Sequence, residues 1–112
     1  MFSLSSSEVY HIYARDCDIR KSFDSLCGLV ISELGKNPTN GDVFIFLNKT
    51  NTHIKLLHWE QDGFVLYYKR LESGTFARPL KDKSIISWSE LVLMIEGVRV
   101  LSSVKKKRYS LP

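Results

Sequence analysis

The sequence predicts a single α+β domain, a two-layer sandwich in the order strand, helix, three antiparallel strands, helix. Three observations favour this class: an early apolar stripe with helical spacing, a run of short apolar segments separated by turn residues, and a helix start signal near residue 87. The 112 residues suit one hydrophobic core. With 44% hydrophobic and 25% charged residues, the composition is that of a globular protein and argues against disorder.

The first strand and the first helix are predicted from side-chain patterning. Residues 8–14 are rich in β-branched and aromatic side chains and precede a polar turn, which is typical of a strand. A helix is expected at 20–34, with Asp18 as its N-cap and Gly35 just past its end. Its apolar stripe consists of Phe23, Leu26, Cys27, Val30, Ile31 and Leu34.

Three strands are expected next, at 43–47, 53–59 and 64–71. The first of them is apolar throughout, as in a strand that is buried on both faces. The dipeptide Asp62-Gly63 between the other two predicts a hairpin with a two-residue turn. In that register Lys55 stands opposite Arg70. Residues 73–84 contain Gly74 and Pro79 and are expected to form a loop.

The last helix begins at a capping box, in which Ser87 and Glu90 each bond to the other's backbone N–H. Gly97 is expected to end this helix, and Val98, Val100 and Leu101 permit a short final strand. The predicted core consists of Phe23, Leu26, Val30, Ile45, Leu57, Leu66, Leu91 and Ile95.

The chain is expected to divide into a flexible serine-rich lead at 1–7, the α+β domain at 8–104 and a basic tail at 105–112. The net charge of +4 equals the charge of the tail residues Lys105, Lys106, Lys107 and Arg108, so residues 1–104 are neutral. Neither a signal peptide nor the ~20 apolar residues of a membrane span is found. Two cysteines without a metal-binding spacing favour a reducing, cytoplasmic setting and no membrane association.

The residue patterns predict no catalytic residues, no metal site and no cofactor. The glycines are scattered singly, and the three histidines are far apart in the sequence. A metal-dependent nuclease is the enzyme alternative, with Asp42 as its first acid, but the next expected acid position reads His53-Ile54-Lys55. Cys17, in a polar turn, is interpreted as a structural residue rather than a reactive thiol.

Basic residues suggest contacts with DNA phosphates. Lys55 and Arg70, side by side in the predicted hairpin, would grip one phosphate between them, unless the strands splay and both side chains reach water. Arg20 and Lys21 lie in the first turn of a helix, where cations oppose the helix dipole. The tail either adds salt-dependent affinity for DNA or keeps the protein soluble. The candidate DNA-binding residues are Arg20, Lys21, Lys55, Lys69, Arg70, Lys105, Lys106, Lys107 and Arg108.

Several segments together resemble one family. They include Met1–Ser7, Asp18–Asp24, Asn40–Phe46, Ile54–Trp59 and Asp62–Phe76, with Ser87–Leu91 and Ile95–Gly97 fitting as well. The chain is similar over residues 1–109 to the TnpB-type accessory protein of the insertion sequence 66 family of bacterial transposable elements. This resemblance implies a non-catalytic accessory role in transposition beside a separate transposase that carries the chemistry. It implies element DNA, that transposase, or both as partners. The alternative is a protein–protein adaptor without direct DNA contact.

Overall fold

The computed structural model describes residues 4–80 and 82–97. The predicted short final strand at 98–101 and the tail at 105–112 therefore lie outside the described residues. The elements in chain order are β1 (Tyr10–Ile12), α1 (Phe23–Ser32), β2 (Val43–Leu47), β3 (His53–Glu60), β4 (Gly63–Arg70), β5 (Ile85–Ile86) and α2 (Trp88–Glu96).

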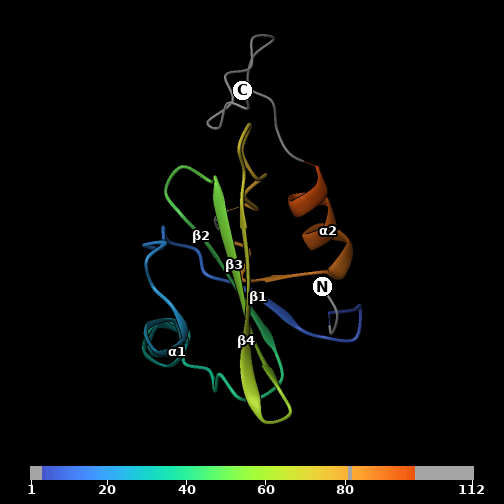
Figure 1. The fold of residues 1–112 in the computed structure, drawn as a ribbon. Coiled ribbons are helices and arrows are strands. Elements are labelled where there is room, and N and C mark those ends of the chain that lie inside the picture. Colours follow the sequence, from blue (N-terminus) through green and yellow to red (C-terminus); the bar gives the residue numbers. More distant parts are fainter. Residues whose placement is uncertain (1–3, 81, 98–112) are drawn as a thin grey trace.

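The strands form one sheet in the order β4-β3-β2-β1-β5. β1 and β2 are parallel, since α1 carries the chain back between them, and every other neighbouring pair is antiparallel. The two helices lie on opposite sides of this sheet (Figure 1). The predicted single α+β domain is confirmed, but the predicted two layers are wrong, because the molecule has three. The central strand β2 is apolar and buried on both faces, so each face needs its own helix.

Each face of the sheet has its own hydrophobic core. On the α1 side, Leu26 and Val30 pack on Phe44, Phe46 and Leu57. The core on the α2 side is larger and contains Tyr10, Val43, Ile45, Leu47, Ile54, Leu56, Leu71, Phe76, Ile86, Leu91, Met94 and Ile95. The prediction that Phe23 lies in the core is wrong, since its side chain is 41% exposed at the start of α1. Leu66 is only partly buried, and the other predicted core residues are buried.

Helix α1 is shorter than the predicted 20–34, and its N-cap is Ser22 rather than Asp18. The Asp18 carboxylate accepts hydrogen bonds from the backbone N–H of Arg20 and from its guanidinium. Gly35 follows the helix with a φ of +63°, a conformation that glycine adopts without strain. The expected glycine with positive φ after α1 is confirmed, but the helix already ends at Ser32, with Glu33 as its C-cap.

Helix α2 begins as predicted. Ser87 Oγ accepts a hydrogen bond from Glu90 N, and Glu90 Oε1 accepts one from Ser87 N, which completes the capping box. Strand β5 lies between the predicted loop at 73–84 and this helix, where no strand was predicted. Its two residues pair with Tyr10 and His11 of β1 and are too few to show a period in the sequence.

Residues 4–7, which the sequence assigns to a flexible lead, contact the domain. Leu4 is buried in the α2-side core, and Ser5 and Ser7 donate hydroxyl hydrogen bonds to the Glu8 carboxylate. Within the described ranges 4–80 and 82–97, neither helix has the length and apolar character that crossing a membrane requires.

Candidate nucleic-acid interface

The register of the β3–β4 hairpin decides where the candidate phosphate-binding residues lie. Glu60 pairs with Gly63, so the turn residues are Gln61 and Asp62, and the positive φ, +59°, falls on Gln61. Lys55 therefore faces Tyr68, and Arg70 faces His53. The predicted pairing of Lys55 with Arg70 is wrong.

The alternation of side chains does not distinguish the two registers. They differ by two residues, and a shift of two leaves every side chain on the same face of the sheet. The observed register places Trp59 opposite Phe64, with ring centroids 5.0 Å apart in an edge-to-face arrangement. It also separates the two like charges that the other register brings together.

Lys55 is a buried residue, only 6% exposed, and is not part of a surface phosphate site. Its ammonium donates hydrogen bonds to the backbone carbonyls of Ile19 (2.6 Å) and Lys21 (2.7 Å). It also lies 4.7 Å from the centroid of the Tyr68 ring, within the range of a cation–π interaction. Lys55 therefore anchors the segment that leads into α1. The expectation that its cationic end is exposed is wrong.

The other candidate cations within the described ranges are at or near the surface. Arg20 pairs with Asp18, and Arg70 pairs with Glu72. Exposed pairs of this kind are weak, so a phosphate can replace either carboxylate at small cost. Within residues 4–80 and 82–97, no ion pair involves Lys21 or Lys69.

These residues gather at one end of the sheet, where β2 ends, β3 begins and β4 ends. Lys69 and Arg70 end β4, and the Lys21 carbonyl is held at the start of β3 by Lys55. The turn before β3 adds Lys49, an exposed lysine that the sequence analysis did not select. We call this group the basic end; it consists of Arg20, Lys21, Lys49, Lys69 and Arg70.

The basic end also lies close to the last turn of α2. Lys69 lines a groove of about 290 Å³ together with Ile95 and Glu96. The described chain therefore ends near this end of the sheet, before the cluster at 105–108. Those four cations lie outside the described residues, and the sequence distance from Gly97 to Lys105 is short.

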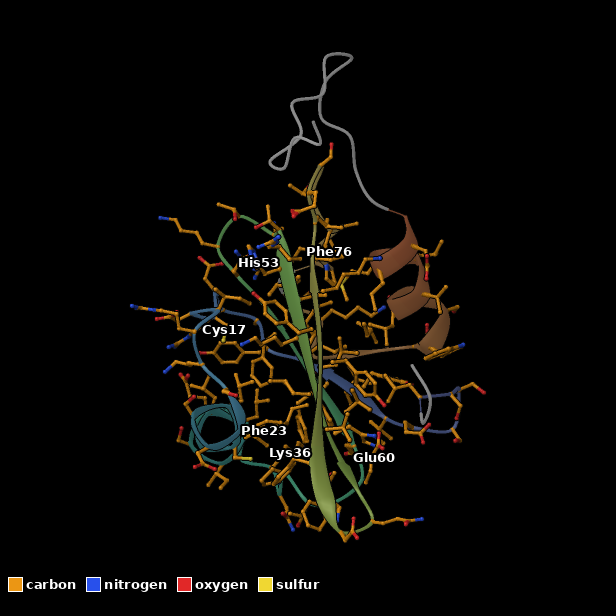
Figure 2. The ribbon with its side chains drawn as sticks, viewed as in Figure 1. Cys17, Phe23, Lys36, His53, Glu60 and Phe76 are labelled. Atoms are coloured by element: carbon orange, nitrogen blue, oxygen red, sulfur yellow. The ribbon has the colours of Figure 1, made fainter. Side chains whose placement is uncertain are left out.

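The opposite end of the sheet is acidic. Figure 2 shows Glu60 and Lys36 at this end, on opposite sides of the sheet, and His53 and Phe76 at the basic end. An open cleft of about 660 Å³ at the acidic end is lined by Glu8, Glu60 and Asp62. A hydrogen bond from the Ser5 hydroxyl lowers the pKa of Glu8, which keeps its carboxylate charged. We call this group the acidic end; it consists of Glu8, Asp42, Glu60 and Asp62.

Two buried histidines bind carboxylates of the acidic end. His11 Nε2 lies 2.7 Å from Asp42 Oδ2. His58 lies 2.9 Å from Glu60 through Nδ1 and 3.1 Å from the carbonyl of Gly41 through Nε2. His58 thus links the end of β3 to the turn that precedes β2.

The structure engages Asp42, the first acid of the nuclease alternative, with His11 and with the amide of Asn40. Throughout residues 4–80 and 82–97, no three His, Cys, Asp or Glu side chains are grouped so as to hold a metal ion. Cys17 is 5% exposed in the α1-side core, and burial raises the pKa of its thiol. A protonated, buried thiol agrees with the structural interpretation of this cysteine.

Comparison with known proteins shows the family. The sequence model of the family described as "IS66 Orf2 like protein" matches residues 8–105. The chain belongs to this family. It is thus a transposition-associated accessory protein, as the sequence resemblance implied.

Two relatives of this IS66 Orf2-like protein come from Sinorhizobium fredii (strain NBRC 101917 / NGR234). "Uncharacterized protein y4jC" is 34% identical over 97 residues, covering 85% of this chain and 82% of the relative. "Uncharacterized protein y4hO" is 30% identical over 83 residues, covering 72% of each chain. No solved structure matches. The IS66 Orf2-like match includes all of the basic end and stops at Lys105, so the other three cations of the tail lie beyond it.

Proposed function

We propose that this IS66 Orf2-like protein is a non-catalytic accessory factor that binds DNA of its transposable element through the basic end. The observation that carries the proposal is the separation of charge along the sheet. Lys21, Lys49 and Lys69 are not engaged in ion pairs within the described ranges, while the acidic end lies at the far end of β3 and β4. Such a surface presents one end of the molecule to a polyanion.

Phosphate contact explains the residue types at the basic end. Lysine ammonium groups bind phosphates as point charges, and the guanidinium groups of Arg20 and Arg70 offer a planar fork for two phosphate oxygens. Lys105–Arg108 would add further phosphate contacts. Contacts of this kind position the protein on DNA and carry no direct sequence information. The protein would act where the element DNA lies, in the bacterial cytoplasm.

The test is a fluorescence-anisotropy titration of a duplex from the element end, repeated at increasing salt. We compare the full-length protein with the double variant Lys49→Gln/Lys69→Gln. Each lysine that meets a phosphate contributes about one unit to the slope of log K against log salt, so the double variant should flatten the slope by about two units. Lys36→Gln, at the acidic end, is the matched control and should leave the slope unchanged.

A double variant that binds with the wild-type slope would contradict the basic end as the DNA contact. Loss of binding on removal of residues 105–112 alone would then assign the contact to the tail. No binding of the full-length protein even at low salt would overturn DNA binding altogether.

The second candidate function is a protein–protein adaptor for the transposase. It is favoured by the groove between β4 and the end of α2, which is lined by Tyr67 and Tyr68 and has the buried side chains of Ile54, Leu56 and Ile95 at its base. Co-purification of the two proteins tests it. Substitution of Leu56 by Ala would be ambiguous because Leu56 is a core residue, so the test variant is Tyr67→Ser. Retained co-purification by this variant would count against the groove.

A further inference from the structure

Strand β4 has an outer edge with free hydrogen-bonding capacity. It is the last strand in the sheet and pairs with β3 alone in the described part of the chain (Figure 1). The two-residue turn closes on the pair Glu60 and Gly63, and in such hairpins the closing pair exchanges both backbone hydrogen bonds. Every second residue of β4, counted from Gly63, therefore bonds to β3. The backbone groups of the residues between them point outward; these are Phe64, Leu66, Tyr68 and Arg70.

A hydrogen bond on the far side of β3 supports this assignment. Asn48 N donates to His53 O, so the backbone of His53 is directed toward β2. The backbone groups of His53 therefore do not bond to Arg70, the residue opposite it in β4. Because bonded and non-bonded pairs alternate, Arg70 and every second residue before it face outward.

Most of the outer edge lacks the prolines and charges that keep natural edge strands from pairing, which are limited here to Lys69 and Arg70 at its end. β4 is eight residues long and contains no proline, and its first six residues, Gly63–Tyr68, carry no charge. The Tyr68 side chain is 53% exposed. An exposed apolar edge of this length is a template for another strand.

We infer that this edge pairs with β4 of a second copy of the chain, antiparallel, about a two-fold axis at Leu66. Residues that face one another across an antiparallel pair lie on the same face of the sheet. A continuous sheet therefore allows only registers that join even-numbered positions to even-numbered ones and odd-numbered positions to odd-numbered ones. The Leu66 register places Phe64 opposite Tyr68 of the second copy and Val65 opposite Tyr67. It also places Arg70, which pairs with Glu72 in its own chain, beside the turn residue Asp62 of the second copy.

Charge selects this register over the next allowed one. Centring the axis on Tyr67 would put Arg70 opposite Phe64 of the second copy and would bring Asp62 opposite Glu72. The Leu66 register instead forms two symmetric pairs of opposite charge at the two ends of an apolar centre. The dimer is a ten-stranded sheet with an α1 and an α2 layer contributed by each copy.

The test measures the self-association constant of the full-length protein by sedimentation equilibrium, without DNA. The single variants Asp62→Arg and Arg70→Asp each place like charges opposite one another twice in the dimer, and each should weaken association by about tenfold. The double variant Asp62→Arg/Arg70→Asp should restore it to near the wild-type value. Lys36→Glu, an exposed charge reversal away from the edge, is the control and should have no effect.

Disulfide trapping tests the register independently. Facing residues that are hydrogen-bonded lie about 5.5 Å apart between Cα atoms, a separation that a disulfide spans. Leu66→Cys should therefore form a covalent dimer on oxidation. Lys69→Cys should not, because the two copies of that position would lie about 20 Å apart along the paired strands.

Three outcomes would overturn the inference. A monomer at all concentrations that gives no trapped dimer rules out the pairing. A monomer whose Leu66 and Tyr68 amides are nevertheless protected from hydrogen exchange would show that another segment of the same chain covers the edge. A dimer that is insensitive to both charge reversals would place the interface elsewhere.

Discussion

Replacing the buried Lys55 by Met should destabilise the fold by about 2 kcal/mol. The side chain makes two hydrogen bonds from a charged donor, each worth about 1.5–3 kcal/mol, and one cation–π contact worth about 1 kcal/mol. Against these gains stands the cost of removing the ammonium from water, which is about several kcal/mol for an ion in a protein interior. Methionine keeps the apolar stem and removes both the polar contacts and the desolvation cost. The net loss of stability is therefore the small difference between the two.

The assay is urea denaturation of Lys55→Met, followed by far-UV circular dichroism and analysed as a two-state transition. The matched control is Lys36→Met, an exposed lysine whose loss should change stability by less than about 0.5 kcal/mol. A Lys55 variant that equals or exceeds the wild type in stability would refute the reasoning, since the desolvation cost would then outweigh the contacts. The folded variant should also keep the wild-type salt slope in DNA binding, because a buried ammonium does not meet phosphate.

Three further predictions concern the caps, the thiols and the phenols. Ser87→Ala should lower stability by about 1 kcal/mol in urea, and an unchanged midpoint would argue against the cap. Cys17 should react with a disulfide reagent more slowly than Cys27, measured on Cys17→Ser and Cys27→Ser variants; the reverse order would contradict the burial of Cys17. Burial raises the pKa of Tyr10 and of Tyr13 to about 12, so the folded state holds their protons where an unfolded phenol loses them. The stability that these two phenols contribute is complete below about pH 10 and is lost as the pH rises toward 12. Phenolate absorbance measures their titration. If all five tyrosines of the folded protein titrated near pH 10, the prediction would be contradicted.

The elements with strong local signals were predicted correctly from the sequence. The capping box of Ser87 and Glu90 and the stop at Gly35 involve residues close in the chain, so a short window contains the whole signal. The strand at 43–47 was also predicted correctly, and its two-sided burial already required cover on both faces. Cover on both faces means one layer on each side of the sheet, three layers in all. The expectation of two layers missed this.

The candidate site was harder to predict because it depends on register and on distant contacts. The two hairpin registers give the same alternation of side chains, and only the turn conformation at Gln61 separates them. The role of Lys55 depends on carbonyls more than thirty positions earlier in the chain. Its place in a row of inward-facing side chains with Leu57 was the available signal, and a lysine in such a row indicates a buried partner.

The position of β1 between β2 and β5, inside the sheet, has a consequence for how the chain reaches its fold. The strands β2, β3 and β4 are consecutive and joined by short turns, so they can associate through local contacts early in folding. β1 comes first in the chain but sits between β2 and β5, and its pairing with Ile85 and Ile86 spans most of the described sequence. Closing loops of that length costs conformational entropy before the new contacts stabilise the chain, and this cost slows folding. The rate-limiting event should therefore be the insertion of β1. Until β5 pairs with β1 and α2 packs on the sheet, β1 has an unpaired edge that other chains in the cell can contact.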